Sequence, residues 1–132
     1  MRNHKDLIVW QKAIFLVQRL YEITRFFPKD EIYGITSQMR RAAVSVPSNI
    51  AEGFGRGHDR ELLHFLYMSL GSASELETQL IISRNIQYLS EEQYEELNGL
   101  NNEIIRMLTS LISKRSAFME KKGFLKPCSL VP

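Results

Sequence analysis

Arginine, serine and asparagine side chains recur at helical steps between residues 39 and 60, in the stretch MRRAAVSVPSNIAEGFGRGHDR. At 100° per residue, one face of a helix collects Arg41, Ser45, Ser48 or Asn49, Glu52 and Arg56. Arginine offers planar donors that match phosphate oxygens, and serine and asparagine add neutral hydrogen bonds. The face therefore predicts a nucleic-acid or anion-binding surface, whose candidate contact residues are Arg40, Arg41, Ser45, Asn49, Arg56 and Arg60.

The same arginines allow a purely structural interpretation. Helix surfaces commonly carry pairs of opposite charge. Arg40 and Arg41 can pair with acidic residues, either within the chain or across a subunit boundary, and the candidates are Glu52, Glu75 and Glu77. In that case this helix belongs to a protein–protein interface and has no role toward nucleic acid. The residue pattern leaves both interpretations open.

The other reactive side chains form no catalytic or metal-binding pattern. The glycines of GFGRG follow no strand and lack the lysine–hydroxyl pair of a phosphate-binding loop, so we expect a turn. The three histidines lack metal-ligand spacing, and the one Glu-x-x-His match, Glu61 to His64, has no second copy. The one cysteine, Cys128, has no paired histidine. We therefore expect no enzyme activity, no metal and no cofactor.

The composition is that of an ordinary globular domain. The chain has 132 residues, of which 44% are hydrophobic and 24% charged, and this length suffices for one core. The formal net charge is +2, divided between +4 for residues 1–60 and −2 for the remainder. The basic first half favours an anionic partner. One cysteine and the absence of a long apolar run suit a reducing cytoplasm and exclude a membrane helix.

Hydrophobic residues at three- and four-residue spacing predict four helices, over about residues 6–27, 32–53, 60–85 and 90–118. Asp6 and Asp59 are expected to cap the first and third helices. Pro28 should stop the first helix, because proline pushes the preceding residue out of helical space. Ser90 and Gln93 have the spacing of a capping box at the start of the fourth.

Pro47 falls inside the second predicted helix. Its missing N–H removes one backbone hydrogen bond, so we expect a kink at this position. The apolar stripe stays in phase on both sides of the proline, which favours one bent helix over two. Gly53, Gly55 and Gly57 are then expected to end it.

Four amphipathic segments with short connections predict an all-α fold, an antiparallel up-and-down four-helix bundle. The bundle domain spans residues 1–118, and residues 119–132, which have two prolines and no periodicity, are expected to form a flexible tail. The core stripe of the first helix is expected at Leu7, Trp10, Ile14, Val17, Tyr21 and Thr24, widened by Ala13, Leu20 and Phe27. Apolar residues off these stripes suggest self-association, and they are Val9, Phe15, Phe26, Val44, Phe54, Leu63, Tyr67 and Met68.

Three blocks of the sequence resemble one known family in the same order. They are DLIVWQKA, SQMRRAAVSVPSNIAEGFGR and FLYMSLGSASELETQL. All three resemble the bacterial four-helix bundle proteins known as 23S rRNA-intervening sequence proteins. The resemblance covers roughly residues 6–118, and its second block is long and specific.

The resemblance implies an up-and-down bundle that assembles into a ring-like homo-oligomer, a pentamer. Relatives include the accessory variability protein of diversity-generating retroelements, which binds nucleic acid and a reverse transcriptase. The resemblance therefore implies an RNA, DNA or nucleoprotein partner and no catalytic residues. It directs attention to the motif positions Arg40, Arg41, Ser45, Pro47, Asn49, Glu52, Gly53, Glu75 and Glu77.

Overall fold

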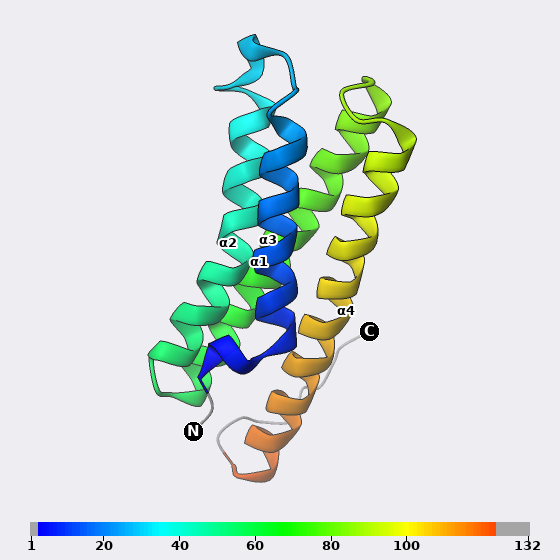
Figure 1. Ribbon diagram of the computed structural model, residues 1–132. Coiled ribbons are helices and arrows are strands. Elements are labelled where there is room, and N and C mark those ends of the chain that lie inside the picture. Colours follow the sequence, from blue (N-terminus) through cyan, green and yellow to red (C-terminus); the bar gives the residue numbers. More distant parts are fainter. Residues whose placement is uncertain (1–2, 124–132) are drawn as a thin grey trace.

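The computed structural model describes residues 3–123, and these form a four-helix bundle (Figure 1). Two short 3₁₀ turns precede or connect the helices, and the elements in order are η1 (His4–Asp6), α1 (Ile8–Thr24), η2 (Lys29–Glu31), α2 (Ile35–Gly55), α3 (Asp59–Asn85) and α4 (Glu91–Lys121). Each α-helix packs against two others, so that α1 and α4 close the ring begun by α2 and α3. The described residues contain no strand. The predicted all-α bundle is confirmed.

Two of the three helix caps expected from the sequence are wrong. Asp6 lies in η1, and α1 begins after Leu7, which gives no side-chain cap. Asp59 is the first residue of α3 and follows His58, so its carboxylate stabilises the helix dipole instead of capping. The prediction for α4 is confirmed, because Ser90 and Gln93 form a reciprocal capping box with both bonds at 3.0 Å.

Helix α2 runs without interruption through Pro47, whose side chain is buried. The predicted kink at this residue stays a prediction. Gly55 is the last residue of the helix, as expected, whereas Gly53 lies inside it. The chain turns only at Gly57, which has a φ of +74°, a left-handed conformation that glycine adopts without strain.

Gly53 has a packing role in place of the expected terminating one. It is buried, and a Cβ atom at this position would lie 3.0 Å from Phe65 Cβ and 3.1 Å from Leu62 Cδ1. These are closer than ordinary van der Waals contacts, so only a glycine lets the backbones of α2 and α3 come this near without a shift. The glycine sets the separation of the two helices at this end of the bundle.

The core follows the predicted stripes in α2 and α3, but in α1 and the residues just after it only in part, through Ala13, Leu20, Thr24 and Phe27. Met39, Val46 and Ile50 are fully buried in α2, as expected. The centre of the buried face of α1 is rotated by about one residue, roughly 100°, from the centre of the predicted stripe, toward Ala13 and Leu20. This face is formed by Val9, Ala13, Leu16, Leu20 and Ile23, while the expected core residue Tyr21 is 41% exposed. Val9 and Leu63, expected outside the core, are buried in it.

Helix α4 continues to Lys121, and Met119 near its end is fully buried. The expected flexible tail lies, from residue 124 onward, outside the described residues, as does Cys128. Asn101 is buried at the centre of the same helix, and its Nδ2 donates a hydrogen bond of 2.9 Å to the carbonyl oxygen of Ala73. This bond links α4 to α3 inside the core.

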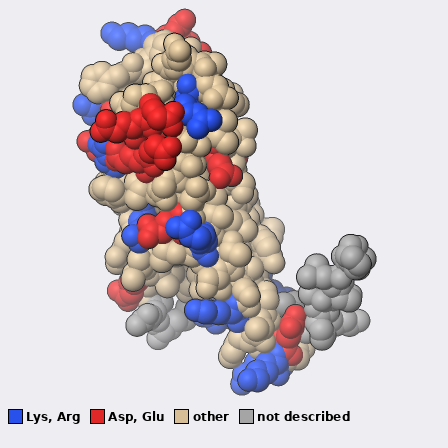
Figure 2. All heavy atoms as spheres, turned by 90° about the vertical axis from the view of Figure 1, so that its right-hand side faces the viewer, with Lys and Arg blue, Asp and Glu red and all other residues tan. Residues whose placement is uncertain are grey.

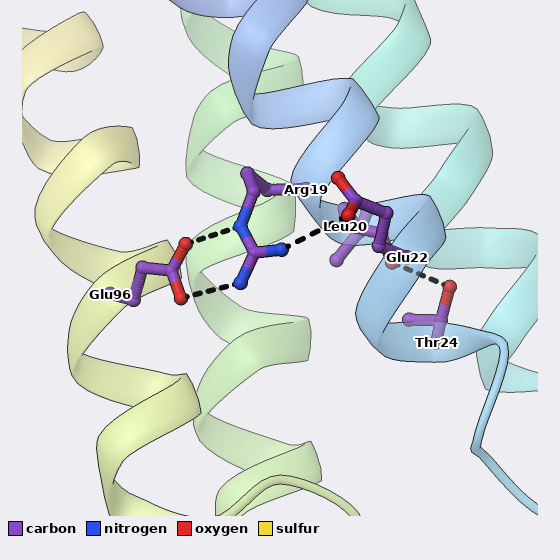
Figure 3. A network of polar contacts seen from close by, with 5 residues as sticks. All are labelled: Arg19, Leu20, Glu22, Thr24 and Glu96. Carbon is purple, nitrogen blue, oxygen red and sulfur yellow. Dashed lines mark hydrogen bonds and ion pairs between the residues drawn. The ribbon is translucent and has the colours of Figure 1, made fainter.

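A charged network links α1 to α4 (Figure 3). Arg19 donates two parallel hydrogen bonds to the carboxylate of Glu96, from Nε and from one terminal nitrogen, and lies 3.3 Å from Glu22. The hydrogen bond from Arg19 lowers the pKa of Glu96 below its ordinary value of 4.5. The same bond raises the pKa of Arg19.

This network predicts a pH-dependent contribution to stability. The folded-state pKa of Glu96 lies below its unfolded value of 4.5, so the contribution is fully present above pH 4.5 and is lost as the pH falls through the folded-state pKa. A Glu96→Gln variant should therefore be less stable than the wild type in urea denaturation at pH 7 and equally stable near the acid limit. Glu95→Gln, at an exposed neighbouring position, is the control. An equal loss of stability at pH 7 in both variants would show that the contact of Glu96 with Arg19 does not stabilise the fold.

Candidate nucleic-acid interface

Arg40 is held against α1 by two contacts. Its Nε donates a hydrogen bond of 3.0 Å to Thr24 Oγ1, and its guanidinium carbon lies 4.5 Å from the centre of the Tyr21 ring. Thr24 is itself fixed, because its hydroxyl donates to the carbonyl oxygen of Leu20 at 2.7 Å (Figure 3). The terminal nitrogens of Arg40 have no partner among the described residues. The side chain is thus oriented by the fold while most of its five N–H donors stay available.

Arg41 is exposed and forms no hydrogen bond or ion pair with any of residues 3–123. Of its expected acidic partners, Glu52 instead pairs with Arg56 at 2.9 Å, and Glu75 accepts a hydrogen bond of 3.2 Å from Gln79. Glu77 is half-buried and contacts neither arginine. The charges of Arg40 and Arg41 are therefore not neutralised within the described part of the chain. Pairing across a subunit boundary stays a prediction.

Arg56 and Arg60 are not brought together with Arg40 and Arg41. Arg56 lies 16 positions after Arg40 on the same helix, which corresponds to about 24 Å along its axis. Its guanidinium is paired with Glu52 and lies 5.2 Å from the centre of the Phe65 ring. Arg60 is exposed in the first turn of α3, at the same end of the bundle as Arg56. The six candidate residues therefore do not form one surface.

Ser45 lies at the contact between α2 and α3, and Asn49 is bonded to it from the next turn of α2. Asn49 Nδ2 donates to both the carbonyl oxygen and the hydroxyl of Ser45, each at 2.8 Å. Ser72 Oγ on α3 donates to Ser45 Oγ at 2.9 Å, and Ser69 Oγ donates to the carbonyl oxygen of Val46 at 2.8 Å. These bonds surround Pro47. The amide nitrogen of Asn49 is therefore committed to Ser45 on the same helix.

Two adjoining pockets lie along the contact between α1 and α2, and we call them together the α1–α2 groove. The first has a volume of about 410 Å³ and is lined by Thr24, Arg25, Phe27, Pro28, Lys29, Ile32, Thr36 and Arg40. The second has a volume of about 530 Å³ and is lined by Tyr21, Ile32, Ser37, Arg40, Arg41, Val44 and Ser45. They share Arg40 and Ile32, and none of their lining residues is acidic. All charged lining residues of the groove are therefore cationic.

Arg25, Lys29 and Tyr21 are the members of this groove that sequence reasoning missed. Arg25 and Lys29 flank Pro28, and a charge count over that turn gives no excess because Asp30 and Glu31 follow. In the structure Glu31 is turned toward the α3–α4 connection, where it accepts a hydrogen bond of 2.8 Å from the Tyr88 hydroxyl. That bond raises the pKa of Tyr88. Only the fold separates the two cations from this neighbouring acid.

Acidic side chains gather on a different face of the bundle. Figure 2 shows them in the upper part of the face that α4 presents, where this helix begins. The exposed acids of these first turns are Glu91, Glu92, Glu95 and Glu96. The small net charge of +2 thus conceals a separation of charge between the start of α4 and the α1–α2 groove.

Two further findings concern the described residues. None of their helices combines the length and the apolar character that crossing a membrane requires. Within residues 3–123, no three histidine, cysteine, aspartate or glutamate side chains lie together where they could hold a metal ion.

Comparison with known proteins identifies the family. The family model of the 23S rRNA-intervening sequence protein matches residues 5–110. A solved structure from Bacteroides thetaiotaomicron VPI-5482, described as a protein with unknown function from the S23 ribosomal protein family, is 25% identical. It superposes with a TM-score of 0.75, over 80% of this chain and 96% of that chain. No curated protein matches the sequence significantly. The chain belongs to the family of 23S rRNA-intervening sequence proteins.

Proposed function

We propose that this chain is a non-enzymatic bundle protein that binds nucleic acid through the α1–α2 groove. The observation that carries the proposal is the pair Arg40 and Arg41, whose charges are not compensated by an acid within the described chain. Arg25 and Lys29 add two cations to the same concave surface. Four cations without an acid attract a polyanion, and arginine matches the geometry of phosphate oxygens.

The fixed position of Arg40 favours binding. A free arginine loses rotational freedom when it contacts a phosphate, and this loss reduces affinity. Thr24 and Tyr21 already hold the Arg40 side chain, so less freedom is lost on binding. Arg40 would orient the phosphate chain, and Arg41 and the exposed Lys29 would follow it.

The proposal includes assembly into a homo-oligomer, a pentamer, in the bacterial cytoplasm. Large apolar side chains are exposed outside the α1–α2 groove, among them Phe15 at 50%, Tyr67 at 57% and Met68 at 44%. Exposed apolar side chains of this kind mark association surfaces when they gather into a patch. Repetition of the groove around a ring would place several cationic sites on one particle, which raises the apparent affinity for a long strand.

A filter-binding titration of the intact protein against a structured ribosomal RNA fragment tests the function. Each neutralised phosphate contributes a slope of about −0.7 to −0.9 to the dependence of log affinity on log salt. With four cations in the groove, affinity should fall by about 50-fold or more from roughly 50 to 200 mM salt. Absent binding, or binding that does not change with salt, would end the proposal.

A second candidate function is a protein-binding or structural module in which Arg40 and Arg41 lie at a subunit interface. The observation in its favour is the apolar surface beside them, since Tyr21 is 41%, Ile32 45% and Val44 39% exposed. Arginine next to exposed aromatic and aliphatic side chains is also typical of interface centres. In this case an Arg41→Ala variant would lower the particle mass measured by light scattering.

A further inference from the structure

We infer that the nucleic acid bound by the α1–α2 groove is single-stranded. The inference rests on the proposed function and specifies the class of ligand. Its basis is that the four cations of the groove are interleaved with apolar and aromatic side chains. Each lining set combines both kinds, with the 45% exposed Ile32 beside Arg25 and Lys29, and Tyr21 beside Arg40 and Arg41. Binding of a phosphate backbone alone requires only the cations, so the apolar and aromatic side chains indicate contact with bases.

The shape of the groove favours unpaired bases. A duplex keeps its bases stacked inside and presents a convex phosphate surface to a protein. The groove is instead made of two hollows of about 410 and 530 Å³, sizes within the range of small-molecule sites. Hollows with apolar walls accept the flat faces of bases that are turned out of a helix. The cations between them would then contact the phosphates that connect successive nucleotides.

Two exposed aromatic residues that adjoin lining residues in the sequence are candidate stacking partners. Tyr33 is 92% exposed and follows the lining residue Ile32, and Phe26 is 83% exposed and lies between Arg25 and Phe27. Large rings that are so exposed contribute nothing to the core. Proteins that bind single strands combine a positively charged path with such rings, because every base has a face that can stack.

Arg40 supplies a further planar surface. Its guanidinium lies over the Tyr21 ring at 4.5 Å and belongs to both pockets. Bases stack on arginine planes as well as on aromatic rings. Thr36, in the wall of the first pocket, is 2% exposed and its hydroxyl has no hydrogen-bond partner among the described residues. The groove thus offers phosphate donors and stacking surfaces in alternation.

The test compares strands of one sequence. Fluorescence anisotropy with the intact protein would measure affinity for a labelled 15-nucleotide RNA without self-complementarity, for the DNA of the same sequence, and for each strand paired with its complement. We expect one or both single strands to bind at least about tenfold tighter than the duplexes. The RNA and DNA arms show which strand the groove accepts.

Substitutions of exposed aromatic residues test whether the single strand binds in the groove. Tyr33→Ala and Phe26→Ala should each weaken single-strand binding by about tenfold and leave duplex binding unchanged. Phe118→Ala is the control, because Phe118 is also an exposed aromatic residue, at 42%, but lies on α4. Equal or tighter binding of the duplex overturns the inference and leaves the proposed function standing. An equal effect of all three variants also overturns it, whereas absence of binding to any strand refutes the proposed function itself.

Discussion

A Gly53→Leu variant should lose about 3 kcal/mol of its free energy of unfolding, because even a single added carbon does not fit between α2 and α3. A Cβ atom would lie 3.0 Å from Phe65 Cβ and 3.1 Å from Leu62 Cδ1, and 3.4 Å from the Leu62 backbone. A leucine adds three further carbons, so the helices must separate. Leucine also has the higher helix propensity, by about 0.8 kcal/mol, so the cost of overpacking must exceed this gain. Urea denaturation at fixed protein concentration measures the difference.

Gly71→Leu is the matched control for this prediction. Gly71 is likewise inside a helix, but a Cβ atom there has no neighbour within 4 Å. The same substitution should therefore raise stability by about 0.8 kcal/mol, through helix propensity alone. If Gly53→Leu were as stable as Gly71→Leu, the close approach of α2 and α3 at Gly53 would be refuted.

The fold class was predictable from the sequence because periodicity and caps are local signals. The capping box of Ser90 and Gln93 and the stripes of α2 and α3 are read from neighbouring residues. The orientation of α1 was predictable only in part in this way. This helix carries apolar residues around most of its circumference, and Tyr21 and Leu20 fit two stripes equally well. Only packing between α2 and α4 selects the face that contains Leu20.

The candidate site was predicted only in part, for a related reason. Helical spacing correctly indicated that Arg41 is exposed, but it could not show that the amide of Asn49 is committed to Ser45. The contacts of Arg40 with Thr24 and Tyr21 join residues 16 and 19 positions apart, and such separations leave no local pattern. The groove therefore depends on how α1 is rotated against α2.

The two halves of the motif in α2, residues 39–53, have different roles. The part from Ser45 to Gly53 builds the contact with α3, through side-chain hydrogen bonds around Pro47 and the close approach at Gly53. The part before it carries Arg40 and Arg41 on the side that faces α1 and solvent. A tightly packed second half would hold the arginines of the first half in place. Substitutions in the second part should therefore lower stability, and substitutions of the arginines in the first part should lower binding without lowering stability.

An Arg41→Glu variant should bind nucleic acid at least tenfold more weakly than the wild type. The slope of log affinity against log salt concentration should be smaller by about 1, the value of one phosphate contact. The substitution removes one phosphate contact and places a negative charge beside the other cations of the groove. Because Arg41 is exposed and unpartnered among the described residues, stability should stay within about 0.5 kcal/mol of the wild type. Anisotropy titrations at two salt concentrations, with urea denaturation in parallel, measure both quantities.

An Arg106→Glu variant is the control, because it distinguishes the effect of the position of a charge from the effect of the net charge. Arg106 is exposed on α4 and also has no partner among residues 3–123, so both variants reduce the net charge from +2 to 0. If binding depends only on total charge, the two variants weaken it equally, and the groove is not the site. If Arg41→Glu instead lowers the particle mass in light scattering while Arg106→Glu does not, Arg41 belongs to a subunit interface. A selective loss of affinity at constant mass and stability is the result that the α1–α2 groove requires, because it links the effect to this surface alone.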